Sequence, residues 1–415
     1  MTQWAPVWRV KIDGTDITDS VLANLTITSG RRNIYEQAQA GYCTITLIIF
    51  GQASLPYEIN DTISIEVQDT SAVYVPIFGG SVVDLSVSVS QVGSSAYTQE
   101  VSITALGALA RIQKALTDGV LTQDFDGNQI YTILHEVLFA QWQQVPAALT
   151  WAAYDPTVTW ATAENSGFGE IDTPGNYELA QRASSRSVVY DLVAALATSG
   201  LGYLYEDASG LISYGDSTHR TTYLATYGYT DLTANQALGR GITIKTRAGD
   251  VRNDLTIKYG TSSANEVNDT DEASIGLYGN LAQIITTTIK HLADASSQAA
   301  FYLALRANPQ PIFDSITYAL TNPELDNADR DALINIFMGQ PIALNDLPPN
   351  MSSGVFQGFV EGWTFRASYN QLDVTLLMSP LAYSLQAMTW SDVPIVETWT
   401  TVSPTLDWAN ATIVS

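Results

Sequence analysis

The fold is decided by residues 29–106, whose longest strand-like run reads Ile77-Phe78-Gly79-Gly80-Ser81-Val82-Val83-Asp84-Leu85-Ser86-Val87-Ser88-Val89. Apolar and polar residues alternate along this run with a period of two, which is typical of a half-buried strand. The same period recurs in residues 43–47, 59–67 and 100–105, with turn residues between them. Consecutive strands of this kind predict an antiparallel sheet that forms a small barrel or sandwich, because closure removes exposed sheet edges.

A second copy of the pattern lies near the C-terminus. The heptapeptide Phe356-Gln357-Gly358-Phe359-Val360-Glu361-Gly362 echoes residues 78–84. Residues 344–347 echo residues 59–63, and residues 372–376 echo residues 101–105. Two unrelated β-domains also share Asn-Asp turns and glycine-containing strands, but the order of the three echoes is preserved. We therefore interpret them as a structural repeat.

Composition favours a protein that works inside an assembly. The chain has 415 residues, enough for two to four domains, and 46% of them are apolar. Charged residues make up 14% of the chain, well below the usual share of about a quarter. A surface covered by hydroxyl and amide groups is desolvated at lower cost than a surface covered by ions. Such a surface suits a subunit better than a freely diffusing enzyme.

Charge and cysteine content exclude several classes. Asp and Glu number 42 against 18 Lys and Arg, and the net charge of −24 argues against a nucleic-acid binder. Cys43 is the single cysteine, so no disulfide framework exists. The N-terminus lacks the basic and apolar regions of a signal peptide, and no apolar run approaches the roughly 20 residues of a membrane span. We expect synthesis and assembly in a reducing cytoplasm.

From end to end, the sequence predicts four segments and a mainly β fold with an α+β insertion. Residues 1–114 are predicted to form a first β-barrel and residues 241–385 a second, related one. Between them, residues 115–240 are expected to form a small α+β domain. Its elements are a helix capped by Asp126 or Asn128, a helix over 187–199 and a hairpin over 202–214. Residues 260–274 are expected to be a polar loop, and residues 386–415 an extended docking tail.

An ordered set of short motifs carries a family resemblance over residues 8–383. The set begins with Trp8-x-Val10 before residues 12–17, Gly30-Arg31-Arg32 before Gly41-Tyr42, and Phe78-x-Gly80-x-Val82. It continues with Arg252-Asn253-Asp254, Tyr278-Gly279 and Phe356-x-Gly358-x-Val360-Glu361-Gly362 before residues 377–380. This order resembles the tail hub, or baseplate hub, proteins of tailed bacteriophages, and it is similar to the base of the type VI secretion spike. Many siphophage minor tail proteins look like this, although the family often has Pro-Gly where this chain has Ala40-Gly41.

The resemblance implies a structural role in the virion, at the tip of the tail. Hub proteins of this kind carry two related barrels per chain and form homotrimers, so three chains make a pseudo-sixfold ring. Such a ring adapts a hexameric tail tube to a threefold tip. The implied partners are a distal tail or tail tube protein, the tape measure protein, and central fibre or receptor-binding tip proteins. DNA would pass through the ring without specific binding.

The sequence singles out no catalytic, metal or cofactor site. Residues 124–128 resemble the start of a calcium loop, but the twelfth position holds His135 instead of Glu. Ser217 lies near His219 without a nucleophile-elbow motif, and a loop after the hairpin is the better interpretation. The alternative function is a virion-borne protein that binds or degrades wall carbohydrates, for which the aromatic residues between 142 and 168 would be the platform.

Six residues are candidates for interface contacts. Arg31 and Arg32 are expected either to bind carboxylates of a partner or to form a solvated pair beside a turn. Residues 150–163 and 398–411 share Thr, Trp, Pro and Ala at equal offsets, and each segment presents two tryptophans around a proline. Either the similarity is chance, or Trp151 and Trp160 contact a subunit within the trimer while Trp399 and Trp408 dock the tail on a neighbour.

Overall fold

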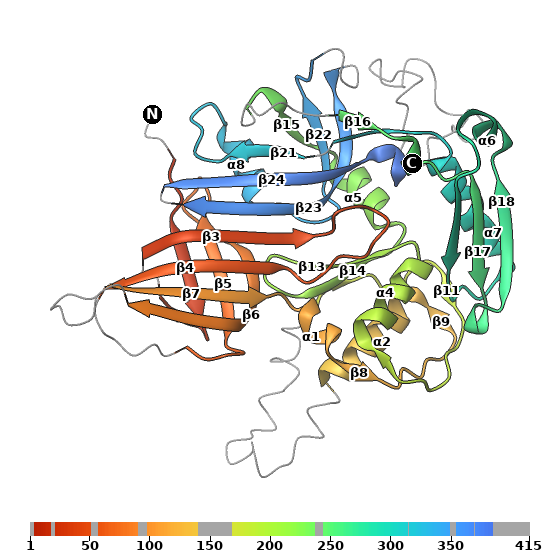
Figure 1. The fold of residues 1–415 in the computed structure, drawn as a ribbon, viewed down its shortest axis with the longest axis horizontal. Helices are drawn as coiled ribbons and strands as arrows, with labels where there is room; N and C mark the ends of the chain where they lie inside the picture. Colours follow the sequence, from red (N-terminus) through yellow and green to blue (C-terminus); the bar gives the residue numbers. More distant parts are fainter. Residues whose placement is uncertain are drawn as a thin grey trace, which may run out of the picture.

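The computed structural model describes residues 4–17, 21–50, 57–89, 98–139, 168–236, 244–313, 315–348, 354–368 and 370–384. The protein is mainly β, as predicted. Its largest sheet runs in the order β15-β22-β23-β3-β4-β7-β6-β5-β1-β2, with β24 beside β23 and β21 beside β24 (Figure 1). Within the described residues this sheet is open, so its strand pairings do not include a closed barrel. None of the helices described is long and apolar enough to cross a membrane.

The N-terminal strand group contains the first seven strands of this sheet. Their bounds are β1 (Trp8–Ile12), β2 (Thr15–Asp16), β3 (Val21–Gly30), β4 (Tyr42–Phe50), β5 (Thr62–Gln68), β6 (Tyr74–Val89) and β7 (Thr98–Leu106). All pairings within the group are antiparallel. Asp13 and Gly14 form the turn between β1 and β2, and both have positive φ, as a two-residue hairpin of this hand requires.

The C-terminal strand group supplies the other five strands of the large sheet and a separate two-stranded sheet formed by β16 and β20. It comprises β15 (Thr230–Thr233), β16 (Ile244–Thr246), β20 (Pro311–Phe313), β21 (Ile316–Ala319), β22 (Pro341–Asn345), β23 (Phe356–Ser368) and β24 (Gln371–Pro380). Strand β23 connects the two groups, because its residues 362–368 pair with β3. Strand β15 precedes residue 241, so the pairings of this group begin before the predicted boundary.

Strands β6 and β23 carry the same irregularity at the same place in the echoed motif. The pairing of β6 with β7 skips Val83, and the pairing of β23 with β24 skips Glu361. Each skipped residue follows the Phe-x-Gly-x-Val pattern directly, and each is therefore the extra residue of a β-bulge. Equal bulges in the two echoed strands support the predicted structural repeat.

The backbone bonds beside the bulges correct the first predicted echo. Val82 exchanges hydrogen bonds with residues 60–61, and Val360 exchanges the equivalent bonds with residues 339–340. The counterpart of the Asn-Asp turn at 60–61 is therefore the Gly-Gln pair at 339–340. The echo proposed for residues 344–347 is wrong, because those residues end β22 instead of preceding it.

The third predicted echo has the right strands in a shifted register. Val82 lies opposite Ala105, and its counterpart Val360 lies opposite Met378. Ala105 therefore corresponds to Met378 and not to Leu376. A shift of two residues keeps every side chain on the same face of the strand, so the alternating pattern alone does not reveal it.

The predicted α+β insertion is confirmed in its main elements. Helix α2 (Asp126–Phe139) begins at Asp126, helix α4 (Val189–Ser199) follows, and β13 (Tyr203–Glu206) and β14 (Ile212–Gly215) form the hairpin. Helix α5 (His219–Tyr227) follows the hairpin where a loop was predicted. The remaining elements are short: α1 (Leu109–Gln113), β8 (Leu116–Thr117), β9 (Asp124–Phe125), β10 (Phe168–Ile171), β11 (Glu178–Leu179) and β12 (Ser187–Val188).

A three-stranded sheet is inserted in the C-terminal half. Strand β17 (Asp254–Tyr259) is central, with β18 (Asn265–Thr270) antiparallel and β19 (Ala282–Thr286) parallel to it. Helices α6 (Glu272–Tyr278) and α7 (Leu292–Arg306) lie beside this sheet at the right of Figure 1. The loop predicted over 260–274 is wrong for most of its length, since β18 and the start of α6 occupy it. Helix α8 (Asn327–Ile334) follows later in the chain.

One connected cluster of buried apolar side chains joins these parts. It includes Ile45 and Ile103 of the N-terminal strand group, Val193 of α4, and Phe365 and Val374 of the C-terminal strand group. Burial of apolar area is the largest favourable contribution to folding. Because the core is continuous, the two strand groups and the insertion are expected to be held in one fixed arrangement.

We predict that Gly30→Ala destabilises the protein more than Gly14→Ala, although both glycines have positive φ. A Cβ on Gly30 would lie 2.4 Å from the carbonyl oxygen of Glu361 and 2.6 Å from Gly362 Cα, whereas a Cβ on Gly14 meets nothing within 4 Å. Backbone strain alone costs about 1–2 kcal/mol, and the clash between β3 and β23 adds about 1–3 kcal/mol. Urea denaturation of both variants measures the difference; equal losses of stability would contradict it.

Candidate functional site: a buried arginine–glutamate cluster

The candidate site lies where β3 ends against the bulge of β23. Gly30 has a φ of 84°, so the chain turns sharply after β3 and directs the next residue inward. The backbone N–H of Arg31 then donates to the carbonyl of the bulged residue Glu361 at 2.7 Å. The Arg31 side chain follows, and its Nε donates to Glu361 Oε2 at 2.6 Å. Two residues that are 330 positions apart are thus joined by backbone and side chain together.

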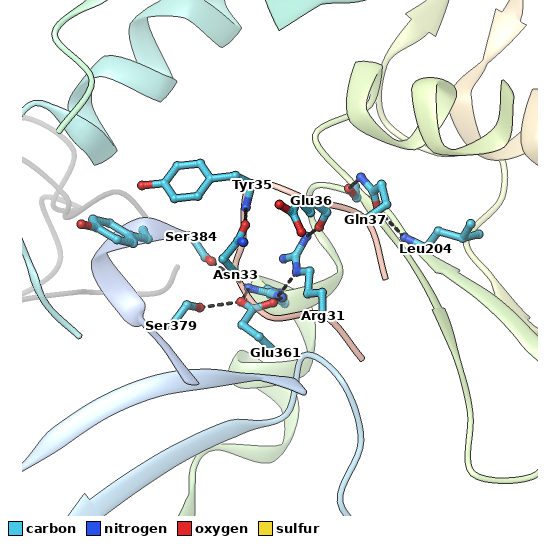
Figure 2. A network of polar contacts seen from close by, with 12 residues as sticks. Arg31, Asn33, Tyr35, Glu36, Gln37, Leu204, Glu361, Ser379 and Ser384 are labelled. Carbon is cyan, nitrogen blue, oxygen red and sulfur yellow. Dashed lines mark hydrogen bonds and ion pairs between the residues drawn. The ribbon is translucent and has the colours of Figure 1, made fainter. Parts of the chain in front are cut away.

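Helix α5 brings a second guanidinium to the same carboxylate. Arg220 donates from Nη1 to Glu361 Oε1 at 2.9 Å and from Nη2 to Oε2 at 3.0 Å, which is the bidentate geometry of a strong pair. Ser379 of β24 donates to Oε1 at 2.5 Å, and Arg220 also donates to the hydroxyl of Ser384 at 2.9 Å. Figure 2 shows Arg31 and Ser379 directed at the carboxylate of Glu361. We call Arg31, Arg220 and Glu361 the arginine–glutamate cluster.

Burial makes this cluster sensitive to the loss of any member. Arg31, Arg220 and Glu361 are 7%, 6% and 2% exposed. Burial alone would raise the pKa of Glu361, but the two guanidiniums outweigh it and lower that pKa to about 2. Burial likewise acts to lower the pKa of Arg220, and attraction to Glu361 outweighs it. The carboxylate is therefore ionised at every physiological pH. Removing one partner of such a buried pair costs about 3–5 kcal/mol.

The loop after Arg31 docks the N-terminal strand group on the insertion. Arg31 Nη1 donates to the carbonyl of Glu36 at 3.1 Å, which closes this loop on itself. The amide of Gln37 donates to the Gly202 carbonyl at 3.1 Å and accepts from the Leu204 N–H at 2.8 Å (Figure 2). The loop therefore contacts β23 at one end and the β13–β14 hairpin at the other.

The structure separates the two arginines that the sequence placed together. Arg31 does bind a carboxylate, but this carboxylate belongs to the same chain, so Arg31 is neither solvated nor available to a partner. Arg32 is exposed at the rim of a cavity of about 150 Å³. Its proposed interface role stays a prediction. Trp151, Trp160, Trp399 and Trp408 lie outside the described residues, as does the predicted tail.

Sequence reasoning missed Glu361 and Arg220 as members of the site. The signal for Glu361 was present, because an acidic residue interrupts the apolar run Phe359-Val360 within a predicted buried strand. No signal marked Arg220, since the helix that carries it was predicted as a loop. Its partner lies 141 residues away, and only the fold brings the two together.

A second feature is an open groove of about 700 Å³ along α5. Its aromatic wall contains Tyr223, whose ring lies 4.7 Å from that of Tyr227 and 5.2 Å from that of Phe337, between ring centroids. Its polar wall contains Asp172, which accepts from His219 Nδ1 at 2.8 Å. His219 has two carboxylates close to it, although the sequence gave it no ligand at the usual spacing. Ligand atoms of Glu170, Asp172 and His219 lie within 4.8 Å of one another.

Two solved structures share this fold along nearly their whole length. The 43 kDa tail protein of prophage MuSo2 from Shewanella oneidensis has a TM-score of 0.54 and 11% identity, with 91% of this chain and 99% of that chain covered. A tail protein from Neisseria meningitidis has a TM-score of 0.58 and 10% identity, with coverages of 92% and 98%. A type VI secretion component from E. coli also matches, but its TM-score of 0.44 is too low to establish a shared fold.

At such low identity the likeness establishes the fold. No protein-family model and no curated protein matches the sequence. The chain has the fold of prophage tail proteins over almost its full length. This agrees with the resemblance to phage tail proteins seen in the sequence motifs.

We predict that Glu361→Gln lowers the free energy of unfolding by about 3–5 kcal/mol, because two buried guanidiniums lose their counter-charge. The folded-state pKa of about 2 lies below the ordinary value of 4.5. The contribution of Glu361 is therefore complete above pH 4.5 and is lost as pH falls toward 2. In the variant, this part of the acid dependence disappears. Urea denaturation from pH 2 to pH 7 measures both effects.

The control for this prediction is Asp118→Asn. Asp118 pairs with Arg186 at 3.4 Å, and the side chains are 60% and 65% exposed. Exposed pairs contribute about 0–1 kcal/mol, so this variant should remain close to the wild type. Similar losses in the two variants would show that the arginine–glutamate cluster has no special role.

Proposed function

We propose that the protein is a structural component of a phage tail, a trimeric hub that joins the tail tube to the tip. The proposal is supported by the fold shared with prophage tail proteins and by one feature of the sheet. In the C-terminal strand group, one strand edge pairs with a strand of the other group in the same chain. The equivalent edge of the N-terminal strand group has no pairing strand among the described residues. A second copy of the chain fits that open edge.

The covered edge belongs to the second half of β23. One side of β23 pairs with β24 throughout, and the other side pairs first with β22 and then, past the bulge, with β3. In register, Gly362 lies opposite Gly30. The junction between the two strand groups is thus a β3–β23 pairing that begins at the bulge.

The open edge belongs to the second half of β6. One side of residues 81–89 pairs with β7, and the other side pairs with β5 only as far as the bulge. Beyond the bulge, no described strand pairs with residues 84–89 on this second side. Val83, Val87 and Val89 are 38%, 48% and 42% exposed there. A long open edge with apolar side chains is a site for strand addition.

The strand that matches this edge is β16. Strand β16 pairs with β20 in the same antiparallel way in which β3 pairs with β4. Thr246, the last residue of β16, therefore corresponds to Gly30, the last residue of β3. No strand among the described residues pairs with the other side of β16. The chain therefore presents two complementary edges, one on β6 and one on β16. Pairing β16 of one copy with β6 of the next gives a heterologous contact, which generates a ring when the rotation closes.

Three copies close the ring in this proposal, as the resemblance to hub proteins implies. Each copy contributes an N-terminal and a C-terminal strand group, corresponding to the predicted domains 1–114 and 241–385. Six similar groups give pseudo-sixfold symmetry, with internal β3–β23 junctions alternating with β16–β6 junctions between copies. Closure would complete the barrels that one chain leaves open. Such a ring matches a hexameric tail tube, or a distal tail protein, on one face and a threefold fibre or tip protein on the other.

The charge of the chain suits a channel through which DNA and the tape measure protein pass. With a net charge of −24, the protein repels the phosphate backbone and offers few contacts that would hold it. We place the protein at the tip of the virion tail after assembly in the host cytoplasm. The role requires no catalysis and no cofactor.

The proposed register predicts a contact between Asp84 and Arg247 of neighbouring copies. In the repeat, Asp84 of β6 is the counterpart of Gly362 of β23, and Thr246 of β16 is the counterpart of Gly30 of β3. Because Gly362 lies opposite Gly30, Asp84 would lie opposite Thr246 of the neighbouring copy, and Arg247 is the next residue. We expect Asp84→Arg or Arg247→Asp to weaken trimer formation about tenfold or more through like-charge repulsion. The double variant restores opposite charges and should recover the trimer. Analytical ultracentrifugation over a concentration series measures this.

The control for the charge reversal is Glu266→Arg, which makes the same change on an exposed position of β18. It should leave the oligomeric state unchanged. A wild-type protein that is monomeric at all concentrations would refute the ring. A stable trimer that both single variants retain would refute the β16–β6 register.

Carbohydrate binding is a second candidate function, and the groove along α5 favours it. Sugar rings pack on aromatic rings, and sugar hydroxyl groups donate hydrogen bonds to carboxylates; the groove offers both kinds of wall. Tyr227 is 72% exposed beside it.

We expect Tyr227→Ala to abolish any binding of wall oligosaccharides, because it removes one exposed face of the aromatic wall. A glycan array followed by calorimetry measures the binding. Tyr42→Ala is the control, since Tyr42 is also exposed but lies on β4. Binding that Tyr227→Ala leaves intact would exclude this groove.

A further inference from the structure

A small cavity beside the arginine–glutamate cluster is lined by cations and hydroxyl groups. Its volume is about 110 Å³, and its lining includes Arg31, Arg220, Arg306, Tyr203 and Tyr383. These residues come from the loop after β3, from α5, from the end of α7, from β13 and from the turn after β24. The cavity therefore lies where all the parts of the chain meet.

Arg306 is the unusual member of this lining. It is 3% exposed, and its guanidinium lies 4.7 Å from the ring centroid of Tyr35 and 4.5 Å from that of Tyr383. Nη2 donates to the carbonyl of Tyr383 at 3.3 Å. Nε and Nη1 are buried without a hydrogen-bond partner, and the ion pairs found among the described residues do not include Arg306. Because a guanidinium stays charged even when it is buried, Arg306 is a buried cation without a paired carboxylate.

Other donors around the cavity are also unsatisfied. Nε of Arg220 and the hydroxyl groups of Tyr203 and Tyr383 are buried without partners. Together with Nε and Nη1 of Arg306, these make five buried donor atoms on four residues without a hydrogen bond of ordinary geometry. An unsatisfied buried donor costs about 1–3 kcal/mol, and a group that accepts from several of them removes this cost.

The charges at the cavity are not balanced. Glu361 is fully occupied by Arg31, Arg220 and Ser379, so it does not neutralise Arg306. Asp216 also lines the cavity, and its Oδ1 accepts from the N–H and the hydroxyl of Thr218, so two carboxylates face three guanidiniums there. The local excess of positive charge favours an anion over water as the occupant.

We infer that this cavity binds a carboxylate, held by Arg306 with the hydroxyl groups of Tyr203 and Tyr383. A planar carboxylate matches the fork of a guanidinium, and the tyrosine rings provide apolar walls for a short carbon chain. The volume admits an acid of the size of acetate. The carboxylate comes either from a small free acid or from an Asp or Glu side chain of a neighbouring chain. Binding here does not depend on the proposed ring.

The test is thermal unfolding of the full chain in acetate against chloride, at equal ionic strength and pH 7. Acetate should raise Tm saturably, by about 2–3 °C at ten times Kd. Arg306→Met should abolish the difference between the two salts. Arg366→Met is the matched control, because it removes an exposed arginine far along β23 and should keep the difference. Where Arg306→Met fails to fold, Tyr203→Phe with Tyr383→Phe keeps the rings and should still weaken acetate binding.

An experimental structure of the assembled protein distinguishes the two sources. Acetate in the cavity of acetate-grown crystals supports a free acid, and an Asp or Glu side chain of another chain on Arg306 supports a partner. Two outcomes overturn the inference. One is an unchanged Tm in acetate together with a cavity that holds only water. The other is Asp250, whose Oδ2 is also buried without a partner, rotated onto Arg306 as an internal counter-ion.

Discussion

The fold depends on how the buried carboxylate of Glu361 is compensated for its loss of contact with water. Glu361 is the extra residue of a β-bulge, and it is buried only because Arg31 and Arg220 provide compensating charge. Neither arginine alone gives it the full set of bonds, so the loop after β3, helix α5 and strand β23 must be in place together. Since an unpaired buried charge is far more costly than a lost surface contact, this cluster fixes how the two strand groups and the insertion are oriented.

Much of the fold was predictable, because the signals for it are local. Alternation in residues 77–89 and the echoed heptapeptide at 356–362 located β6 and β23, and the helical periodicity located α2 and α4. The register of the repeat was not predictable, since a shift of two residues leaves every side chain on the same face. Residues 260–274 were taken for a loop because their polar composition hides a strand with little buried area.

The candidate site was harder to predict than the fold. The sequence left two alternatives open for Arg31, a carboxylate of a partner or a solvated pair beside a turn, and the structure shows a buried carboxylate of the same chain instead. That answer depends on a bulge, on a left-handed glycine and on a helix 141 residues from the bulge. None of these leaves a periodic pattern. The same backbone bulge carries Val83 in β6 and Glu361 in β23, and of the two only Glu361 is buried in ion pairs.

The separation of Arg31 from Glu361 by 330 residues also has a consequence for the order of folding. During synthesis the N-terminal strands emerge first, and the outer edge of β3 stays without its partner until β23 has left the ribosome. Contacts between such distant residues form late and slowly, because the intervening chain must first be ordered. An incomplete or truncated chain therefore lacks the junction and exposes the outer edge of β3 as well as that of β6. Completion of the junction thus distinguishes a finished chain from an unfinished one.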